Sequence, residues 1–181
     1  MTHDHSHSPG GEGSPSSREH KHHAPRSVAC FVVTSSDSRS EASDESGQLI
    51  RALLEEAGHP IAGSALIKDE PLALRAVLEQ RAPEAHAQAV IISGGTGLSR
   101  RDTTVETLEA LLEKRLPGFG ELFRFLSFQE IGTAAMMSRA VAGSFKGMAV
   151  FALPGSPAAG RLALTRLILP ELGHAARELS R

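Results

Sequence analysis

Residues 89–97 read Ala-Val-Ile-Ile-Ser-Gly-Gly-Thr-Gly, and this stretch decides the fold class. Its apolar first half predicts a buried strand. Residues 103–106, Thr-Thr-Val-Glu, have the spacing of a capping box and predict that a helix begins there. A glycine turn between a strand and a helix leaves backbone N–H groups free at the positive end of the helix dipole, where phosphate binds well. The stretch therefore predicts an α/β protein with an anion pocket.

The glycine loop does not match the two most familiar phosphate-binding motifs. Residues 95–104 lack the Gly-Lys-Ser/Thr ending of a Walker A loop. Gly95-Thr96-Gly97 is followed by Leu98, Ser99 and Arg100, without the third glycine of a dinucleotide fingerprint. By itself, the loop is compatible with a nucleotide site or with a glycine-rich turn that binds nothing.

Strand and helix signals alternate along the rest of the chain. This order predicts a largely parallel sheet covered by helices on both faces. The expected strands span 28–34, 61–68 and 88–93, and 140–153 holds two short extended pieces. The expected helices span 44–57, a segment that begins at Pro71, 104–115, 119–131, 158–169 and 170–179.

Polar residues follow each of the first three expected strands: Ser36-Asp37, Asp69 and the segment 93–102. Ligands of parallel sheets collect at the carboxyl ends of the strands, so these residues are expected to share one crevice. Asp69 and Asp102 are the candidate catalytic pair, either through Mg²⁺ on phosphate oxygens or as proton acceptors. Each also has a purely structural alternative, since aspartate is a good helix cap and turn residue.

Two further features accompany this crevice. Arg100 and Arg101 are ordinary solvated charges, or one of them neutralises a phosphate. A second glycine loop, Leu153-Pro154-Gly155-Ser156-Pro157, lies between the last extended piece and a helix. It forms either another rim of the site or a plain turn, and it does not fit the G-x-S-x-G nucleophile elbow.

Composition excludes several classes of function. The chain has 181 residues, 40% of them hydrophobic, which suffices for one substantial core. The net charge of −2 and the absence of Trp and Tyr argue against a nucleic-acid partner. The single cysteine, Cys30, excludes an internal disulfide and fits a buried structural thiol. No apolar run approaches the roughly 18 residues that span a bilayer and no signal-peptide core is present, so a cytoplasmic location is expected.

Residues 1–26 differ in composition from residues 27–181, which we expect to form the single domain. The first segment is rich in Ser, Gly, Pro and His and has few apolar residues, which predicts a disordered tail. Its histidines either hold Zn²⁺, Ni²⁺ or Cu²⁺ or are solvated without a specific ligand. They are six of the nine in the chain: His3, His5, His7, His20, His22 and His23.

Six motifs occur in one order along residues 27–179: Ser36-Asp37-Ser38-Arg39, Asp44-Glu45-Ser46-Gly47, Ser93 to Gly97 with Arg101-Asp102, Pro117-Gly118-Phe119-Gly120-Glu121, Ser138-Arg139 and Leu153-Pro154-Gly155-Ser156. Together they resemble the MoaB/Mog family of molybdenum-cofactor biosynthesis proteins. The stretch from Phe123 to Thr133 is more similar to the MoaB branch. The histidine-rich tail lies outside the family pattern, and Gln88 stands where relatives often carry an acid.

The resemblance implies a three-layer α/β sandwich that forms trimers, or hexamers in the MoaB branch. Phe119, Phe123 and Phe125 would then face neighbouring subunits or pack in the core. It also implies adenylyl transfer from ATP to molybdopterin with release of pyrophosphate, assisted by Mg²⁺, and a MoeA-type partner that uses the product for metal insertion.

The resemblance also implies a set of site residues. Asp69 and Asp102 match the catalytic aspartates, with Mg-ATP between them, and Gly94 to Gly97 match the phosphate cradle. The nucleotide- and pterin-binding positions, this cradle included, are Ser36, Asp37, Ser93, Gly94, Gly95, Thr96, Gly97, Arg101, Ser138, Arg139, Pro154, Gly155 and Ser156.

Two other functions stay open at this point. A non-catalytic MoaB-type protein would bind pterin or nucleotide or serve in assembly, and the retention of Asp69 and Asp102 favours catalysis over it. A phosphatase could use the same anion pocket, and it would release free phosphate without pterin. Trimer against hexamer, and molybdenum against tungsten use, are also left undecided.

Overall fold

The computed structural model describes residues 25–181, and a six-stranded sheet forms its centre. The strand order is β2-β1-β3-β6-β5-β4, and β2, β1, β3 and β6 are mutually parallel. β5 runs antiparallel to β6, and β4 antiparallel to β5. The strands are β1 (Cys30–Ser35), β2 (Ile61–Ile67), β3 (Ala89–Ser93), β4 (Lys114–Arg115), β5 (Val141–Phe145) and β6 (Met148–Leu153).

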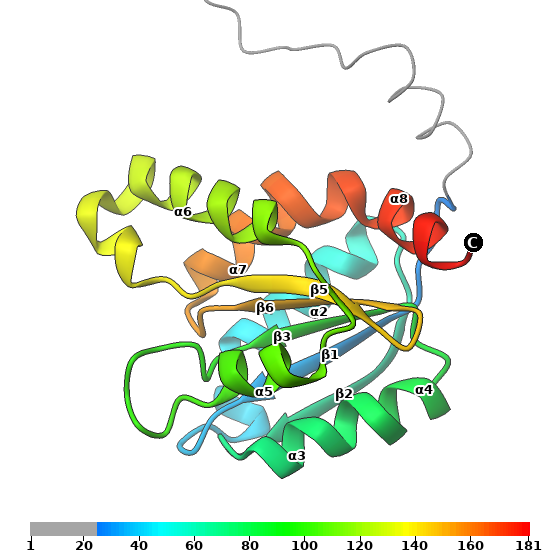
Figure 1. The fold of residues 1–181 in the computed structure, drawn as a ribbon, viewed down its shortest axis with the longest axis horizontal. Helices are drawn as coiled ribbons and strands as arrows, with labels where there is room; N and C mark the ends of the chain where they lie inside the picture. Colours follow the sequence, from blue (N-terminus) through cyan, green and yellow to red (C-terminus); the bar gives the residue numbers. More distant parts are fainter. Residues whose placement is uncertain (1–24) are drawn as a thin grey trace, which may run out of the picture.

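Helices cover both faces of this sheet, which makes three layers (Figure 1). One face carries α2 (Glu45–Glu56), α6 (Pro117–Ile131), α7 (Pro157–Ala163), η4 (Leu164–Ile168) and α8 (Leu169–Leu179). The other carries α3 (Pro71–Ala76), η2 (Val77–Arg81), α4 (Ala82–Glu84) and α5 (Thr104–Leu111). Two short 3-10 segments, η1 (Glu41–Ser43) and η3 (Gly132–Met137), complete the list. The three-layer, mostly parallel α/β fold is as expected.

The alternation of side chains along the strands builds two cores. Cys30 and Val32 of β1 pack on the face that carries α2 and α6. Phe31 and Val33 pack on the face that carries α3 and α5. Every residue of β1, β3 and β6 is buried, as is typical of parallel strands with helices on both sides. The four parallel strands therefore end together at one edge, where their loops can form a site.

The helix expected at 104–115 is shorter than predicted. It begins at Thr104 but ends at Leu111, and Lys114–Arg115 forms β4. The cause is tertiary: Glu113 N donates to Ser144 O at 2.9 Å and Leu116 N to Ala142 O at 2.7 Å. The predicted capping box is also wrong, because the Thr103 side chain accepts no capping hydrogen bond.

Two other expectations have clear outcomes within residues 25–181. Cys30 is fully buried, and burial raises the pKa of its thiol to about 12, so the structural interpretation is confirmed. No helix of this part of the chain is long and apolar enough to cross a membrane. The predictions for the six histidines and the disordered tail fall on residues 1–24, outside the described residues.

Candidate active site

A cavity of about 560 Å³ opens at the carboxyl ends of the four parallel strands. The loops after β1, β2, β3 and β6 all contribute to its wall, as expected, although Asp37, Ser93 and residues 98–101 do not line it. The loop residues that line it are Ser35, Ser36, Ser38, Arg39, Asp69, Gly94, Gly95, Thr96, Gly97, Asp102, Pro154, Gly155 and Ser156. Ser138, which follows η3, lines it as well.

Asp69 and Asp102 both line this cavity. Oδ1 of Asp69 accepts a hydrogen bond from Ser35 Oγ at 2.7 Å. The N-cap of α3 is Glu70, so Asp69 does not take the capping role that was its alternative. Oδ2 of Asp102 accepts from Ser99 N at 2.9 Å, so Asp102 orders a turn while it faces the cavity. Each carboxylate keeps its other oxygen free of hydrogen bonds to residues 25–181.

The glycine loop is packed tightly enough to require glycine. Gly94 has a φ of +103°, and a Cβ there would collide with the Ser35 carbonyl oxygen. Gly95 has a φ of +64°, and a Cβ there would lie 2.7 Å from Asp69 Oδ1. The N–H groups of residues 95–98 make no hydrogen bond within the described part of the chain. Consecutive free N–H groups in a glycine turn form an anion-binding concavity.

Arg139 approaches the glycine loop without lining the cavity. Its Nε donates to Thr96 O at 3.0 Å, and its Nη2 donates to Gly97 O. Its Nη1 donates to Glu106 in the first turn of α5. The pKa of Glu106 is lowered, chiefly by the hydrogen bond from Arg139. Arg139 therefore contacts the predicted phosphate loop rather than the cavity itself.

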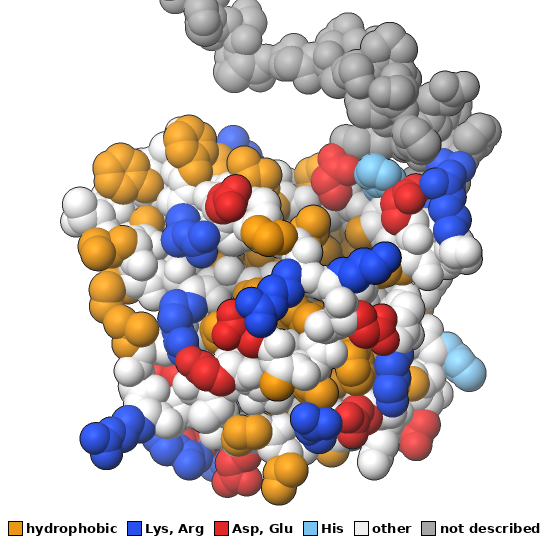
Figure 2. All heavy atoms as spheres, viewed as in Figure 1, with side chains coloured by type: hydrophobic (Ala, Val, Ile, Leu, Met, Phe, Trp, Pro, Cys, Tyr) orange, Lys and Arg blue, Asp and Glu red, His pale blue; other side chains and the backbone are white. Residues whose placement is uncertain are grey.

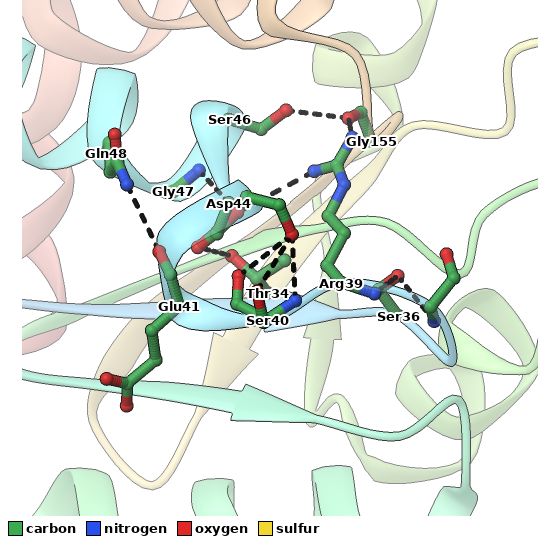
Figure 3. Close-up of polar contacts among 12 residues, drawn as sticks. Thr34, Ser36, Arg39, Ser40, Glu41, Asp44, Ser46, Gly47, Gln48 and Gly155 are labelled. Carbon is green, nitrogen blue, oxygen red and sulfur yellow. Dashed lines mark hydrogen bonds and ion pairs between the residues drawn. The ribbon is translucent and has the colours of Figure 1, made fainter.

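The second glycine loop, 154–156, is fixed by the segment after β1 (Figure 3). Arg39 Nη2 and Ser46 Oγ both donate to Gly155 O, each at 2.7 Å. Asp44 lies 3.6 Å from the Arg39 guanidinium and accepts from Thr34 Oγ1 at 2.8 Å and Gly47 N at 3.0 Å. The close-up shows Asp44 at the centre of these contacts. This network joins the loops after β1 and β6.

Asp37 and Arg101 pair with each other and do not line the cavity. Arg101 donates twice to the Asp37 carboxylate, at 2.8 and 2.9 Å. This contact lowers the pKa of Asp37 and raises that of Arg101. Asp69 N donates to Asp37 Oδ1 at 3.3 Å, so the pair lies next to the candidate catalytic carboxylate.

Three hydroxyl groups near the site are buried without a hydrogen-bond partner among residues 25–181: those of Ser93, Thr104 and Ser138. Of these, only Ser138 lines the cavity. Buried hydroxyl groups are usually satisfied by protein, water or ligand, so Ser138 has hydrogen-bonding capacity to offer a bound molecule.

One wall of the cavity and two residues that support its loops are not predicted from the sequence. Ser127 and Glu130 of α6 and Met137 of η3 also line the cavity. Phe123, Ser127 and Glu130 recur at helical spacing, which could have been read as one face of α6. Arg39 stood in a quoted motif but was not predicted as a site residue. Glu106 was considered only as a helix cap.

The donor set suits a hard cation shared with a substrate. No group of three or more His, Cys, Asp or Glu side chains able to hold a metal occurs in residues 25–181. Asp69 and Asp102 offer two carboxylates in one cavity. Mg²⁺ is commonly held by one or two carboxylates together with substrate phosphates and water, so the residues fit a magnesium–nucleotide complex.

Comparison with known proteins gives the same family from sequence. The family described as "Probable molybdopterin binding domain" matches residues 31–174. The molybdenum cofactor biosynthesis protein B of Halalkalibacterium halodurans is 49% identical over 162 residues, which cover 89% of this chain and 95% of that protein. The protein of the same name from Bacillus subtilis is 48% identical over 163 residues, covering 90% and 96%.

Solved structures agree in fold. A crystal structure of a molybdenum cofactor biosynthesis protein B superposes with a TM-score of 0.82 at 48% identity, covering 87% of this chain and 99% of that one. The tungsten cofactor synthesizing protein MoaB from Pyrococcus furiosus gives 0.79 at 33% identity, covering 87% and 100%. The Mog protein from Mycobacterium ulcerans gives 0.74 at 29% identity, covering 84% and 99%. The chain therefore belongs to the MoaB/Mog family of molybdenum-cofactor biosynthesis proteins, and among these relatives it is more similar to the MoaB members.

Proposed function

We propose that this protein transfers the adenylyl group of ATP to molybdopterin and releases pyrophosphate. One observation carries the proposal: two carboxylates line one cavity at the carboxyl edge of the sheet together with three consecutive residues, Gly95 to Gly97, whose N–H groups make no hydrogen bond within residues 25–181. N–H groups in a concave turn suit phosphate oxygens, and paired carboxylates suit a divalent cation that accompanies ATP. Family membership supplies molybdopterin as the second substrate.

The proposed reaction is a direct displacement. A terminal phosphate oxygen of molybdopterin attacks the α-phosphorus of ATP, and a new P–O–P bond forms. The bond from the α-phosphorus to the oxygen that bridges it to the β-phosphorus breaks, and pyrophosphate leaves with that oxygen. Positioning and charge stabilisation can supply most of the acceleration in such chemistry, so no protein nucleophile is needed.

The chain's own residues take distinct roles in this proposal. The N–H groups of residues 95–98 donate to phosphate oxygens of ATP and hold the reacting phosphate in place. Asp69 and Asp102 hold Mg²⁺, which supplies positive charge against the charge on the reacting phosphate. The loop 154–156 borders the nucleotide, and Ser138, whose hydroxyl group has no partner among residues 25–181, borders the pterin.

The direct test is an assay of purified protein with ATP, Mg²⁺ and molybdopterin. We expect pyrophosphate release that depends on molybdopterin, and no covalent adenylyl–protein species by intact mass spectrometry. Free phosphate without pterin would indicate the phosphatase alternative. Binding of both ligands without turnover would indicate the non-catalytic alternative. A trapped adenylyl–protein would contradict direct transfer.

Two isosteric variants test the carboxylates themselves. Asp102→Asn keeps an oxygen that can accept from Ser99 N, and Asp69→Asn keeps one for Ser35 Oγ, but both variants lose the charge. We expect kcat to fall by about 100-fold or more, the size typical of losing one transition-state contact. Glu109→Gln, an exposed carboxylate on α5, is the matched control and should keep full activity. A wild-type kcat in Asp102→Asn would contradict the catalytic role proposed for Asp102.

We also propose a homo-oligomer, a trimer or a hexamer. The support is an apolar surface on α6 and η3, which we call the α6 surface: Leu122, Phe125, Phe128, Ile131 and Met136, each between 54% and 77% exposed. Figure 2 shows hydrophobic side chains gathered at the upper left of the molecule, where Figure 1 draws α6. Contiguous apolar patches on a protein surface commonly mark interfaces. A MoeA-type protein that consumes the product and a cytoplasmic location stay predictions from the sequence.

A further inference from the structure

We propose that Arg139, held by Glu106, is a positioning residue that sets the direction of the anion-binding N–H groups in the glycine loop. The inference rests on the proposed function only for its kinetic consequences. The structural claim is that a side chain outside the cavity determines the direction of two peptide units of the glycine loop. Arg139 thus acts through the loop and does not touch the ligand.

The guanidinium of Arg139 contacts both the glycine loop and Glu106, which holds it in place. Nε and Nη2 donate to the carbonyl oxygens of Thr96 and Gly97, two consecutive peptide units. Nη1 donates to Glu106, which belongs to the first turn of α5. A planar guanidinium presents its donors in a fixed fork, so these partners fix its orientation. A lysine at this position could not serve all three.

The direction of the N–H groups follows from peptide geometry. In a trans peptide unit the C=O and the following N–H point in opposite directions. Because Arg139 binds the oxygens of Thr96 and Gly97, the N–H groups of Gly97 and Leu98 point away from Arg139. Thr96 and Gly97 line the cavity and Arg139 does not, and neither N–H group has a hydrogen-bond partner among residues 25–181. These are the N–H groups assigned above to phosphate.

Such a loop needs an external restraint. Glycine permits both signs of φ, so rotation of the Thr96–Gly97 peptide meets little steric resistance at Gly97. A rotated unit would direct a carbonyl oxygen at the phosphate in place of an N–H group. The hydrogen bond from Arg139 Nε to Thr96 O opposes that rotation, and the hydrogen bond from Nη2 to Gly97 O opposes rotation of the next peptide unit. The side chains of Arg139 and Glu106 are 26% and 57% exposed, so water screens part of their ion pair and its contribution to global stability is modest, which favours positioning over folding as its role.

The test uses inorganic pyrophosphate as the probe, which requires no molybdopterin. In the wild type we expect its addition to shift the amide NMR signals of Gly97 and Leu98. Arg139→Lys keeps the positive charge but loses the fork, and we expect pyrophosphate affinity by calorimetry to fall by about tenfold or more. Glu106→Gln should weaken it less, because Gln still accepts a hydrogen bond. Arg115→Lys and Glu109→Gln alter another arginine–glutamate pair, between β4 and α5, and should change nothing.

Several outcomes would overturn the inference. Arg139→Lys with wild-type pyrophosphate affinity would show that charge alone suffices. A wild-type protein whose Gly97 and Leu98 signals ignore pyrophosphate would show that these N–H groups do not bind anions. If Arg139→Lys does not fold, Glu106→Gln at unchanged Tm carries the test: weaker binding supports the inference, and unchanged binding overturns it.

The kinetic arm separates this inference from the proposed function. If the wild type transfers adenylyl groups, Arg139→Lys should raise KM for ATP and lower kcat, whereas a merely structural role would lower only the amount of folded protein. A wild type without transferase activity, combined with a loss of pyrophosphate binding in Arg139→Lys, would reject adenylyl transfer and keep the role of Arg139. An active wild type, combined with an Arg139→Lys variant of unchanged pyrophosphate affinity, KM and kcat, would keep adenylyl transfer and reject the role of Arg139.

Discussion

His59 shows how one buried side chain can tie stability to pH. It is 7% exposed, and its Nδ1 accepts a hydrogen bond from Val28 N at 3.1 Å. Burial lowers its pKa from the usual value of 6.5. As the pH falls through 6.5, an unfolded chain therefore takes up a proton at this position that the folded protein resists. Stability supplied by neutral His59 is fully present above this pH and is lost progressively below it.

We accordingly expect the Tm of the wild type to fall between pH 7 and pH 5. The carboxylates of Asp37 and Glu106 do not cause this change, because hydrogen bonds from arginine lower their pKa values and the stability that they supply is lost only as the pH falls toward and below their ordinary values of 3.8 and 4.5. His59→Asn keeps an acceptor for Val28 N but cannot titrate, so its Tm should depend less on pH. Thermal unfolding followed by circular dichroism at several pH values measures both slopes. An equal dependence of Tm on pH in the two proteins would show that His59 does not cause the change.

At the scale of elements, the turn between β5 and β6 places two consecutive residues in the left-handed backbone conformation. Lys146 and Gly147 have φ angles of +47° and +75°, and a Cβ on Gly147 would meet no atom within 4 Å. Gly147→Ala should therefore destabilise the protein by about 1–2 kcal/mol, because of the left-handed conformation and not because of a clash.

Gly118 provides the matched control for this turn. It lies in the first turn of α6, and a Cβ there also meets nothing within 4 Å. Gly118→Ala should stabilise the protein by up to about 1 kcal/mol, since alanine favours helices. Urea unfolding of the two variants should thus shift the midpoint in opposite directions. A shift of the same sign and size in both would refute the conformational explanation.

The elements that the sequence predicts well are those with strong local signals. β1, β2 and β3 begin and end within two residues of the predicted bounds, since apolar β-branched runs are bounded by polar turns or glycines. The helix at 104–115 was predicted too long, because its last residues pair with β5, some 30 residues away. The boundary at 169–170 between two expected helices vanishes, since α7, η4 and α8 follow one another directly.

The candidate site also has parts that local sequence signals predict and parts that depend on contacts between distant residues. Glycine loops and aspartates at strand ends are visible in the sequence, and parallel topology alone predicts that they meet. The hydrogen bond between Arg139 and Glu106 joins residues 33 positions apart, and that between Arg39 and Gly155 joins residues 116 positions apart. No local sequence pattern predicts such contacts. The wall from α6 was also missed, because Ser127 and Glu130 reach the cavity only once that helix packs across the sheet. Whether Asp69 and Asp102 catalyse stays a prediction.

For the whole molecule, the distribution of exposed apolar side chains is uneven. Of the nine large apolar side chains that are more than half exposed in residues 25–181, six belong to α6 and η3. Phe125, Phe128 and Met136 share one shallow surface hollow with Arg124 and Thr133. The Phe residues implied by the family resemblance separate accordingly: Phe119 and Phe123 pack in the core, and Phe125 is 60% exposed. A second copy of the chain is the proposed occupant of this surface.

The oligomer can be tested by charging the α6 surface. Burying a phenylalanine contributes about 1.5–3 kcal/mol, so Phe125→Glu with Phe128→Glu should weaken self-association by about two orders of magnitude or more. Sedimentation velocity over a range of concentrations should show the wild type as a trimer or hexamer and the double variant as smaller species of unchanged helix content. Leu72→Glu is the control, since Leu72 is 78% exposed on α3, on the opposite face of the sheet. If Leu72→Glu dissociates the assembly and the double variant does not, the contact between copies lies on the face that carries α3.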